Sequence, residues 1–155
     1  MTSLYCIDTC SLIHGYREVY PPEHFPRLWQ KLEGLIGDGR LIAPNEVMLE
    51  LKQGDDDLAR WARAQKGLFV PHDLSLQRAL QDLQVRHTGF SRVASTGPLA
   101  DPWLIALATL RNGLVVTEEV PNGHPASVKI PDVCKKEGLS YVRFVEIIKR
   151  EGWSF

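Results

Sequence analysis

Four acidic side chains are the strongest candidates for chemistry in this sequence: Asp8, Glu50, Asp101 and Glu119. Carboxylates that converge repel one another, at a cost of about 4 kcal/mol for two unit charges about 4 Å apart at an effective dielectric constant of about 20. A cluster of them therefore requires a compensating cation, and hard carboxylate oxygens suit Mg²⁺ or Mn²⁺. Such a cation can orient a water molecule, lower its pKa and neutralise charge on a phosphodiester during hydrolysis.

Each acid also has a structural interpretation. Asp8 is suited to cap a turn with Thr9 or Ser11, and Asp101 before Pro102 is typical of a helix N-cap followed by proline. The other acids fit ordinary helix and loop positions. No single acid is therefore informative, and the hypothesis of a shared site depends on their joint position in the fold.

The remaining titratable side chains give little support for a second site. The five histidines show no metal-ligand spacing and are interpreted as surface side chains, although His14 is near enough in sequence to approach Asp8. Glu46, four residues before Glu50, is interpreted as a partner of its helix dipole.

Short apolar runs predict the elements that would position the acids. Strands are predicted at residues 4–7, 41–44, 68–70 and 114–117, with a further edge strand at 128–130. Helices are predicted at 28–36, 46–51 with Asn45 as N-cap, 55–65, 76–83 and 101–110, with a last amphipathic segment at 140–151. Residues 87–99 are predicted to form a loop.

The alternation of strands and helices predicts an α/β fold. We expect a single domain over residues 1–155, with three α/β/α layers and a mainly parallel central sheet. Ligands of such folds bind outside the carboxyl ends of the strands, and the candidate acids stand at these ends or at the start of a helix that faces them. The sequence therefore predicts that they meet at one edge of the sheet.

Length and composition limit the class of protein. The chain has 155 residues, 44% hydrophobic and 24% charged, which is typical of a globular domain and excludes collagens, coiled coils and disordered tails. Its longest apolar stretch is too short to span a bilayer, and its first residues do not resemble a secretory signal, so no membrane association is expected. Three cysteines without a close pair indicate reduced thiols and a cytoplasmic location.

Four motifs, in order along the chain, resemble those of the PIN-domain nucleases. They are an apolar strand closing in Asp-Thr, a strand and helix with Glu-Leu, Asp-x-x-x-x-Ala on a buried helix, and an apolar strand followed by Thr, any residue and an acid. They occupy residues 5–13, 41–51, 101–106 and 115–119. The tail, at residues 129–134 and 151–155, resembles small single-domain bacterial PIN proteins of the VapC-like toxin type.

This resemblance implies a metal-dependent endoribonuclease. Asp8, Asp101 and Glu119 would be metal-binding and catalytic acids for Mg²⁺ or Mn²⁺, and Glu50 would be a further catalytic acid that binds the metal or orients water. The position two after the first Asp is often Asn or Ser in the family, and in this sequence it is Cys10.

The resemblance also implies supporting residues and partners. Supporting contacts to the acids or to the substrate are expected from Thr9, Ser11, Thr117 and Glu118. The expected partners are an RNA substrate, an antitoxin protein that blocks the acidic groove, and a second copy of the chain in a homodimer.

The net charge of −1 argues against a nucleic-acid partner, because phosphate contacts need cations. If four of the 19 acids bind metal, however, 15 acids remain against 18 basic residues. The sequence therefore predicts weak RNA binding without a divalent cation and stronger binding with one.

Two other functions remain open from the sequence. A phosphatase of the haloacid-dehalogenase type also begins with a strand ending in Asp, but it normally needs Asp-x-Asp, and here Cys10 replaces the second acid. A non-catalytic module that keeps the PIN fold to bind RNA or protein is suggested by Cys10 and by Glu at position 119.

Overall fold

The computed structural model describes residues 2–54, 56–87, 100–121 and 128–155. Its centre is a five-stranded sheet in the order β3-β2-β1-β4-β5, in which all neighbouring strands pair in parallel. The strands are β1 (Tyr5–Ile7), β2 (Leu41–Pro44), β3 (Phe69–Val70), β4 (Leu114–Val116) and β5 (Tyr141–Val142). In the central strand, Cys6 pairs with Ile42 on one side and with Val115 on the other.

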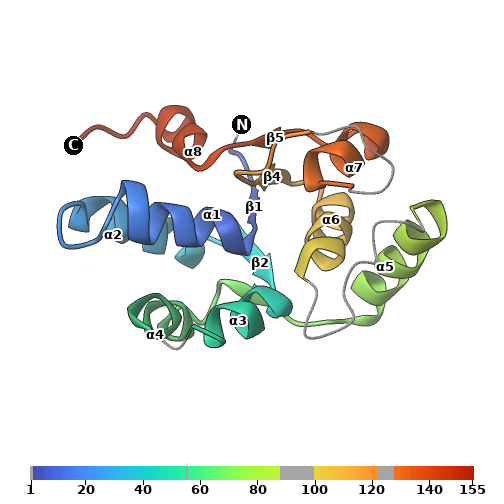
Figure 1. Ribbon diagram of the computed structural model, residues 1–155, viewed down its shortest axis with the longest axis horizontal. Helices are drawn as coiled ribbons and strands as arrows, with labels where there is room; N and C mark the ends of the chain where they lie inside the picture. Colours follow the sequence, from blue (N-terminus) through green and yellow to red (C-terminus); the bar gives the residue numbers. More distant parts are fainter. Residues whose placement is uncertain (1, 55, 88–99, 122–127) are drawn as a thin grey trace.

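Helices cover both faces of this sheet. They are α1 (Thr9–Ile13), which continues into the π-helical segment η1 (His14–Val19), α2 (Pro26–Gly37), α3 (Asn45–Lys52), α4 (Asp57–Ala64), α5 (Leu74–Arg86), α6 (Ala100–Arg111), α7 (Ile130–Glu137) and α8 (Phe144–Glu151). In Figure 1, α1, α2 and α8 lie on one side of the strands, and α5, α6 and α7 lie on the other. The predicted three-layer α/β/α fold with a parallel sheet is therefore confirmed.

Two apolar cores result from the alternation of side chains along each strand. Tyr5 and Ile7 of β1 pack into the core that includes α2 and α8, whereas Cys6 packs into the core that includes α6 and α7. Val116 and Val115 of β4 divide between the two cores in the same way. Successive strand residues point to opposite faces, so a sheet covered on both sides needs apolar residues at every position.

A hydrogen-bonded ion pair fastens the last helix to the amino end of β1. Glu151 accepts from Arg40 Nη1 at 2.8 Å and from Arg40 Nη2 at 2.6 Å, which makes the pair bidentate. The Tyr5 hydroxyl donates to the same carboxylate at 2.7 Å. The Arg40 hydrogen bonds lower the pKa of Glu151, while burial and the neighbouring Glu151 raise the pKa of Tyr5 to about 12.

The edge strand predicted at residues 128–130 is wrong. Ile130 is the first residue of α7, and Pro131 stands in its first turn, where the missing N–H of proline has no cost. Asp132 closes a capping box with Lys129, and Gly138 ends the helix in a left-handed conformation with φ of 71°. The edge strand beside β4 is β5, within the segment predicted as only amphipathic.

The segment after β1 also differs from the prediction. The sequence suggested a polar turn, but α1 begins directly after Asp8, whose side chain accepts a hydrogen bond from the Ser11 backbone. The predicted loop at residues 87–99 falls mainly outside the described residues, which end at His87 and resume at position 100. Within the described ranges, each helix is too short or too polar to cross a bilayer.

Candidate active site

Asp8 is the buried centre of the carboxyl edge of the sheet. It follows β1 directly, is only 2% exposed, and its Oδ1 accepts from the Ser11 backbone N–H at 2.7 Å. Oδ2 accepts from the Thr117 hydroxyl at 2.7 Å and from the Cys10 thiol at 3.1 Å. Burial raises the pKa of Asp8, and these donors act in the opposite direction.

Two threonine hydroxyls connect the acids to neighbouring elements. Thr117, which follows β4, donates to Asp8 and accepts from the backbone N–H of Glu119 at 3.1 Å. Thr9, at the start of α1, donates to Glu50 Oε1 of α3 at 2.5 Å. These contacts hold β1, β4, α1 and α3 together at one edge of the sheet.

The pKa of Asp101, at the start of α6, is raised by burial and by all the other candidate acids. Its pKa rises from an ordinary 3.8 to about 7, first because it is buried and then because Glu119, Asp8 and Glu50 repel its negative charge. Lys129 acts in the opposite direction but does not compensate. Asp101 is therefore largely protonated at slightly acid pH unless a cation enters the site.

Glu119 occupies the side of the site nearest α7. Burial and the charge of Asp8 raise its pKa, whereas Lys129 and a hydrogen bond from the Ile130 backbone lower it. Since Ile130 is the first residue of α7, Glu119 lies at the positive end of that helix.

The donor chemistry of these four acids fits a hard divalent cation, because all of their ligating atoms are carboxylate oxygens. Burial and the neighbouring acids raise the pKa values of Asp101 and Glu119, and a bound cation would favour their charged forms. In the described parts of the chain, no group of three or more His, Cys, Asp or Glu side chains is already arranged to hold a metal ion.

The two remaining predicted site residues have different surroundings. The Ser11 side chain is fully buried and helps to lower the pKa of Asp8. Glu118 instead accepts from the Phe144 backbone at 3.2 Å and lies 3.4 Å from His14 Nε2 and 3.8 Å from Arg143 Nε. Glu118, His14, Arg143 and Phe144 line a separate small cavity of about 190 Å³.

A neighbouring group at the same edge was missed by the sequence prediction. Glu46 of α3 is only 8% exposed, and its Oε1 lies 2.7 Å from His72 Nε2, within hydrogen-bond distance. The His72 ring stacks on Trp103 of α6, with centroids 3.8 Å apart and planes 6° apart. The interpretation of His72 as a scattered surface histidine is therefore wrong. The one feature of the sequence that pointed to this group was the position of Glu46 one helical turn before Glu50.

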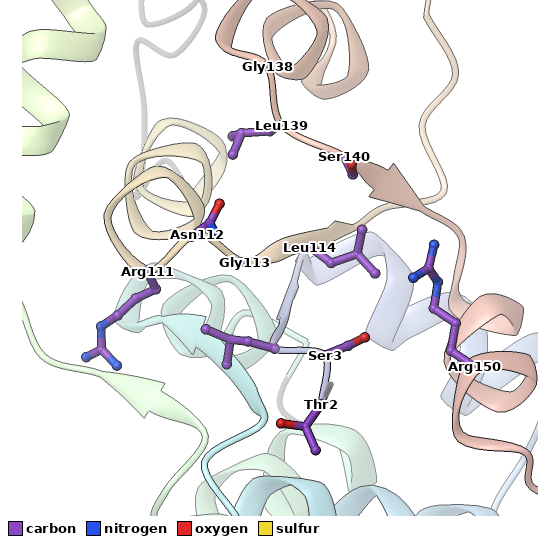
Figure 2. A pocket seen from close by; sticks show the side chains of 11 residues that line it. Thr2, Ser3, Arg111, Asn112, Gly113, Leu114, Gly138, Leu139, Ser140 and Arg150 are labelled. Atoms are coloured by element: carbon purple, nitrogen blue, oxygen red, sulfur yellow. The ribbon is translucent and has the colours of Figure 1, made fainter.

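Another cavity, of about 460 Å³, lies at the opposite, amino edge of the sheet. Figure 2 shows Ser3 and Leu114 on its floor, with Arg111 and Arg150 on opposite sides. Its lining contains none of the four candidate acids.

Comparisons with known proteins agree with the fold. A family model described as "Domain of unknown function (DUF4411)" matches residues 5–155. No curated protein matches the chain. Among solved structures, it is similar to a chain in the crystal structure of VapBC2 from Rickettsia felis bound to a DNA fragment from their promoter, with a TM-score of 0.51 and 12% sequence identity. The similarity covers 91% of this chain and 98% of that chain, and at this identity it shows the PIN-like fold alone.

Proposed function

The chain belongs to the family described as domain of unknown function DUF4411, and from its PIN-like fold and its acidic edge we propose that it is a metal-dependent endoribonuclease. The reaction is hydrolysis of an RNA phosphodiester bond by water, with Mg²⁺ or Mn²⁺ as the cofactor. We further propose that residues 1–155 act as one PIN-like domain.

The convergence of four acids from separate segments is the observation that carries this proposal. Asp8, Glu50, Asp101 and Glu119 come from the ends of β1 and β4 and from α3 and α6, yet all of the others raise the pKa of Asp101. Buried carboxylates that converge repel one another, so bringing these four together costs folding free energy. Their retention at the ligand-binding edge of a parallel sheet supports a functional role.

A divalent cation at this edge would supply charge neutralisation of the phosphodiester and activation of a water molecule. Asp8, Asp101 and Glu119 are the residues proposed to hold it. Asp8 is suited to this role because the Ser11 N–H and the Thr117 hydroxyl fix the orientation of its carboxylate.

Glu50 is proposed to orient the attacking water and to accept its proton as the bond from phosphorus to the leaving oxygen breaks. The hydrogen bond from the Thr9 hydroxyl to Glu50 Oε1 helps to fix the orientation of this carboxylate. Thr117, Ser11 and Glu118 are proposed to support the acids or the substrate.

The similarity to VapBC2, a complex that its authors describe as bound to promoter DNA, supports the proposal that this chain is the toxin of a toxin–antitoxin pair. An antitoxin that covers the acidic edge, an RNA substrate, a homodimer and a cytoplasmic location belong to the same proposal. The three cysteines are free thiols, which agrees with a reducing compartment.

A non-catalytic RNA-binding or protein-binding module is the second candidate. The observations that favour it are Cys10, at a position that is often Asn or Ser in the PIN-domain family, and Glu at position 119. The phosphatase alternative is not supported, because Cys10 donates its thiol hydrogen to Asp8 and offers no second carboxylate.

The decisive experiment measures cleavage of a labelled RNA by the wild type, Asp8→Asn and Asp101→Asn in Mn²⁺ or Mg²⁺. We expect cleavage that EDTA abolishes and that both variants lose. Asp82→Asn, on the exposed face of α5, is the matched control and should cleave normally. Full activity in both site variants would refute the proposal, and metal-independent RNA binding without cleavage would favour the second candidate.

A further inference from the structure

The stacked pair of His72 and Trp103 lies beside the acidic edge but has no role in the proposed reaction. A separation of 3.8 Å between ring centroids and an angle of 6° between planes describe a nearly parallel aromatic stack. The His72 side chain keeps 26% of its surface exposed, and Trp103 is also only partly buried. The pair is thus accessible to solvent.

The orientation of His72 is fixed from several sides. Glu46 holds its Nε2 at 2.7 Å, Trp103 covers one ring face, and the Gln77 side chain donates to its backbone carbonyl at 3.1 Å. The next residue, Asp73, caps α5 by accepting from the Leu76 N–H at 2.8 Å. A partly exposed ring that is held this firmly loses little conformational entropy when a ligand binds to it.

The position of the pair follows from the two helices that carry its neighbours. Glu46 and Glu50 are four residues apart on α3 and therefore share one helix face. Trp103 and Asp101 belong to the same turn of α6, which contacts α3. His72 itself follows the carboxyl end of β3, which pairs with β2 at the edge of the sheet. The stack therefore continues the acidic edge in the direction of β3.

We propose that the His72–Trp103 stack is a nucleobase-binding platform for a nucleotide adjacent to the acidic site, an inference that rests on the proposed ribonuclease function. Proteins bind single-stranded nucleic acids by stacking bases on aromatic side chains, and every base has a π-face that can stack. An acidic edge binds the sugar-phosphate backbone poorly without a cation, so affinity from the base is useful at this position. Glu46 acts as the positioning residue that keeps the imidazole ring parallel to the indole.

The test compares two probes that carry the same phosphate and contain no phosphodiester bond. Adenosine 5′-monophosphate and ribose 5-phosphate differ only in the base, and binding of each to the full chain is measured by calorimetry in the presence of Mg²⁺. We expect the wild type to bind the nucleotide about tenfold more tightly, which is within the usual effect of one stacked base. Binding should also quench tryptophan fluorescence, and Trp103→Phe should remove most of that quenching.

The variants separate stacking from structure. His72→Ala should abolish the preference for the nucleotide, so that both probes bind with about equal affinity. His72→Phe should retain most of the preference, because it keeps a planar ring on Trp103. Glu46→Gln, which keeps a hydrogen-bonding oxygen, should weaken the preference only slightly. Circular dichroism confirms that each variant is folded.

The possible outcomes distinguish this inference from the proposed function. An unchanged preference in His72→Ala, or equal affinity of the wild type for both probes, overturns the platform even if the wild type cleaves RNA. A preference that requires His72, in a protein that cleaves no RNA with any divalent cation, supports the platform and refutes the nuclease.

Discussion

The two ends of strand β1 place carboxylates in opposite environments. At the amino end, Glu151 accepts two hydrogen bonds from Arg40 and one from Tyr5, and its pKa is lowered. At the carboxyl end, Asp8 lies among other acids, and burial raises its pKa and that of Asp101. At one end the negative charge is paired with an arginine, and at the other burial and neighbouring acids disfavour the charged form.

This difference separates stability from function along a single strand. The paired end fastens α8 to the sheet, so its charges contribute to the free energy of unfolding. The acidic end reduces that free energy, because like charges are held together without enough cations. We therefore expect substitutions at the two ends to have opposite effects, and the predictions below begin with the largest.

Asp101→Asn should lower RNA cleavage by at least about a hundredfold while raising stability. Activity falls because a proposed metal ligand is lost. The free energy of unfolding at pH 7 should rise by on the order of 2 kcal/mol, because a buried and repelled negative charge is removed. Cleavage assays and urea unfolding measure the two effects. A variant that loses both activity and stability would contradict the proposed division of roles.

Arg40→Met should destabilise the protein by about 2–3 kcal/mol without a direct effect on the acidic edge. It removes both Arg40 hydrogen bonds from the mostly buried Glu151 carboxylate and leaves the one from the Tyr5 hydroxyl. The control is Arg60→Ala, which removes an exposed ion pair with Asp57 and should cost less than about 0.5 kcal/mol. Equal losses in the two variants would show that the Arg40–Glu151 pair is not the anchor of α8.

The pH dependence of stability should have opposite signs at the two ends. The pKa of Asp101 in the folded protein, about 7, exceeds its ordinary 3.8, so the folded state binds more protons between these values. Its contribution makes stability fall as pH rises from about 4 to 7, by on the order of 2–4 kcal/mol. The pKa of Glu151 is lower in the folded protein than its ordinary value of 4.5, so its carboxylate stabilises the fold at pH values above 4.5. This stabilisation is lost as the pH falls through the pKa of Glu151 in the folded protein.

Thermal unfolding from pH 3 to pH 8 tests this prediction. Asp101→Asn should flatten the profile between about pH 4 and 7, and Glu151→Gln should flatten it at lower pH. If stability rises steadily from pH 4 to 7 in both the wild type and Asp101→Asn, other groups dominate the pH dependence.

Cys10→Ser should have the smallest effect, with cleavage within about threefold of the wild type. A serine hydroxyl can also donate to Asp8, although from a shorter bond, so the carboxylate keeps its orientation. Cys10→Ala removes the donor and should lower metal affinity more than Cys10→Ser does, as measured by calorimetry. Identical metal affinity in both variants would show that the thiol does not position Asp8.

The elements with strong local patterns were predictable from the sequence. The apolar runs that became β1, β2 and β4 are buried and bounded by clear turn or helix signals, and they indicated where the acids would meet. The edge strand β5 has only two residues and no distinctive pattern. The start of α1 at Thr9 was missed because the same polar residues are typical of turns and of capped helix starts, and here Asp8 caps a helix.

The group of Glu46, His72 and Trp103 could not be predicted for a different reason. Its members come from three segments, separated by 26 residues between Glu46 and His72 and by a further 31 to Trp103. Their meeting depends on the contact between α3 and α6 and on the position of β3 at the edge of the sheet. Local periodicity contains no information on such contacts.

The pairing of β1 with β4 also sets the time at which the acidic edge can form during synthesis. Asp8 leaves the ribosome well before its partner Thr117, which lies 109 residues later in the chain. Domains fold as units once the necessary chain has emerged, and non-local parallel pairing comes late. A nascent chain therefore carries separated acids and no assembled site. If the mature protein cleaves RNA, the messenger that encodes it and the ribosome that makes it are exposed to a finished enzyme only after most of the chain has been translated.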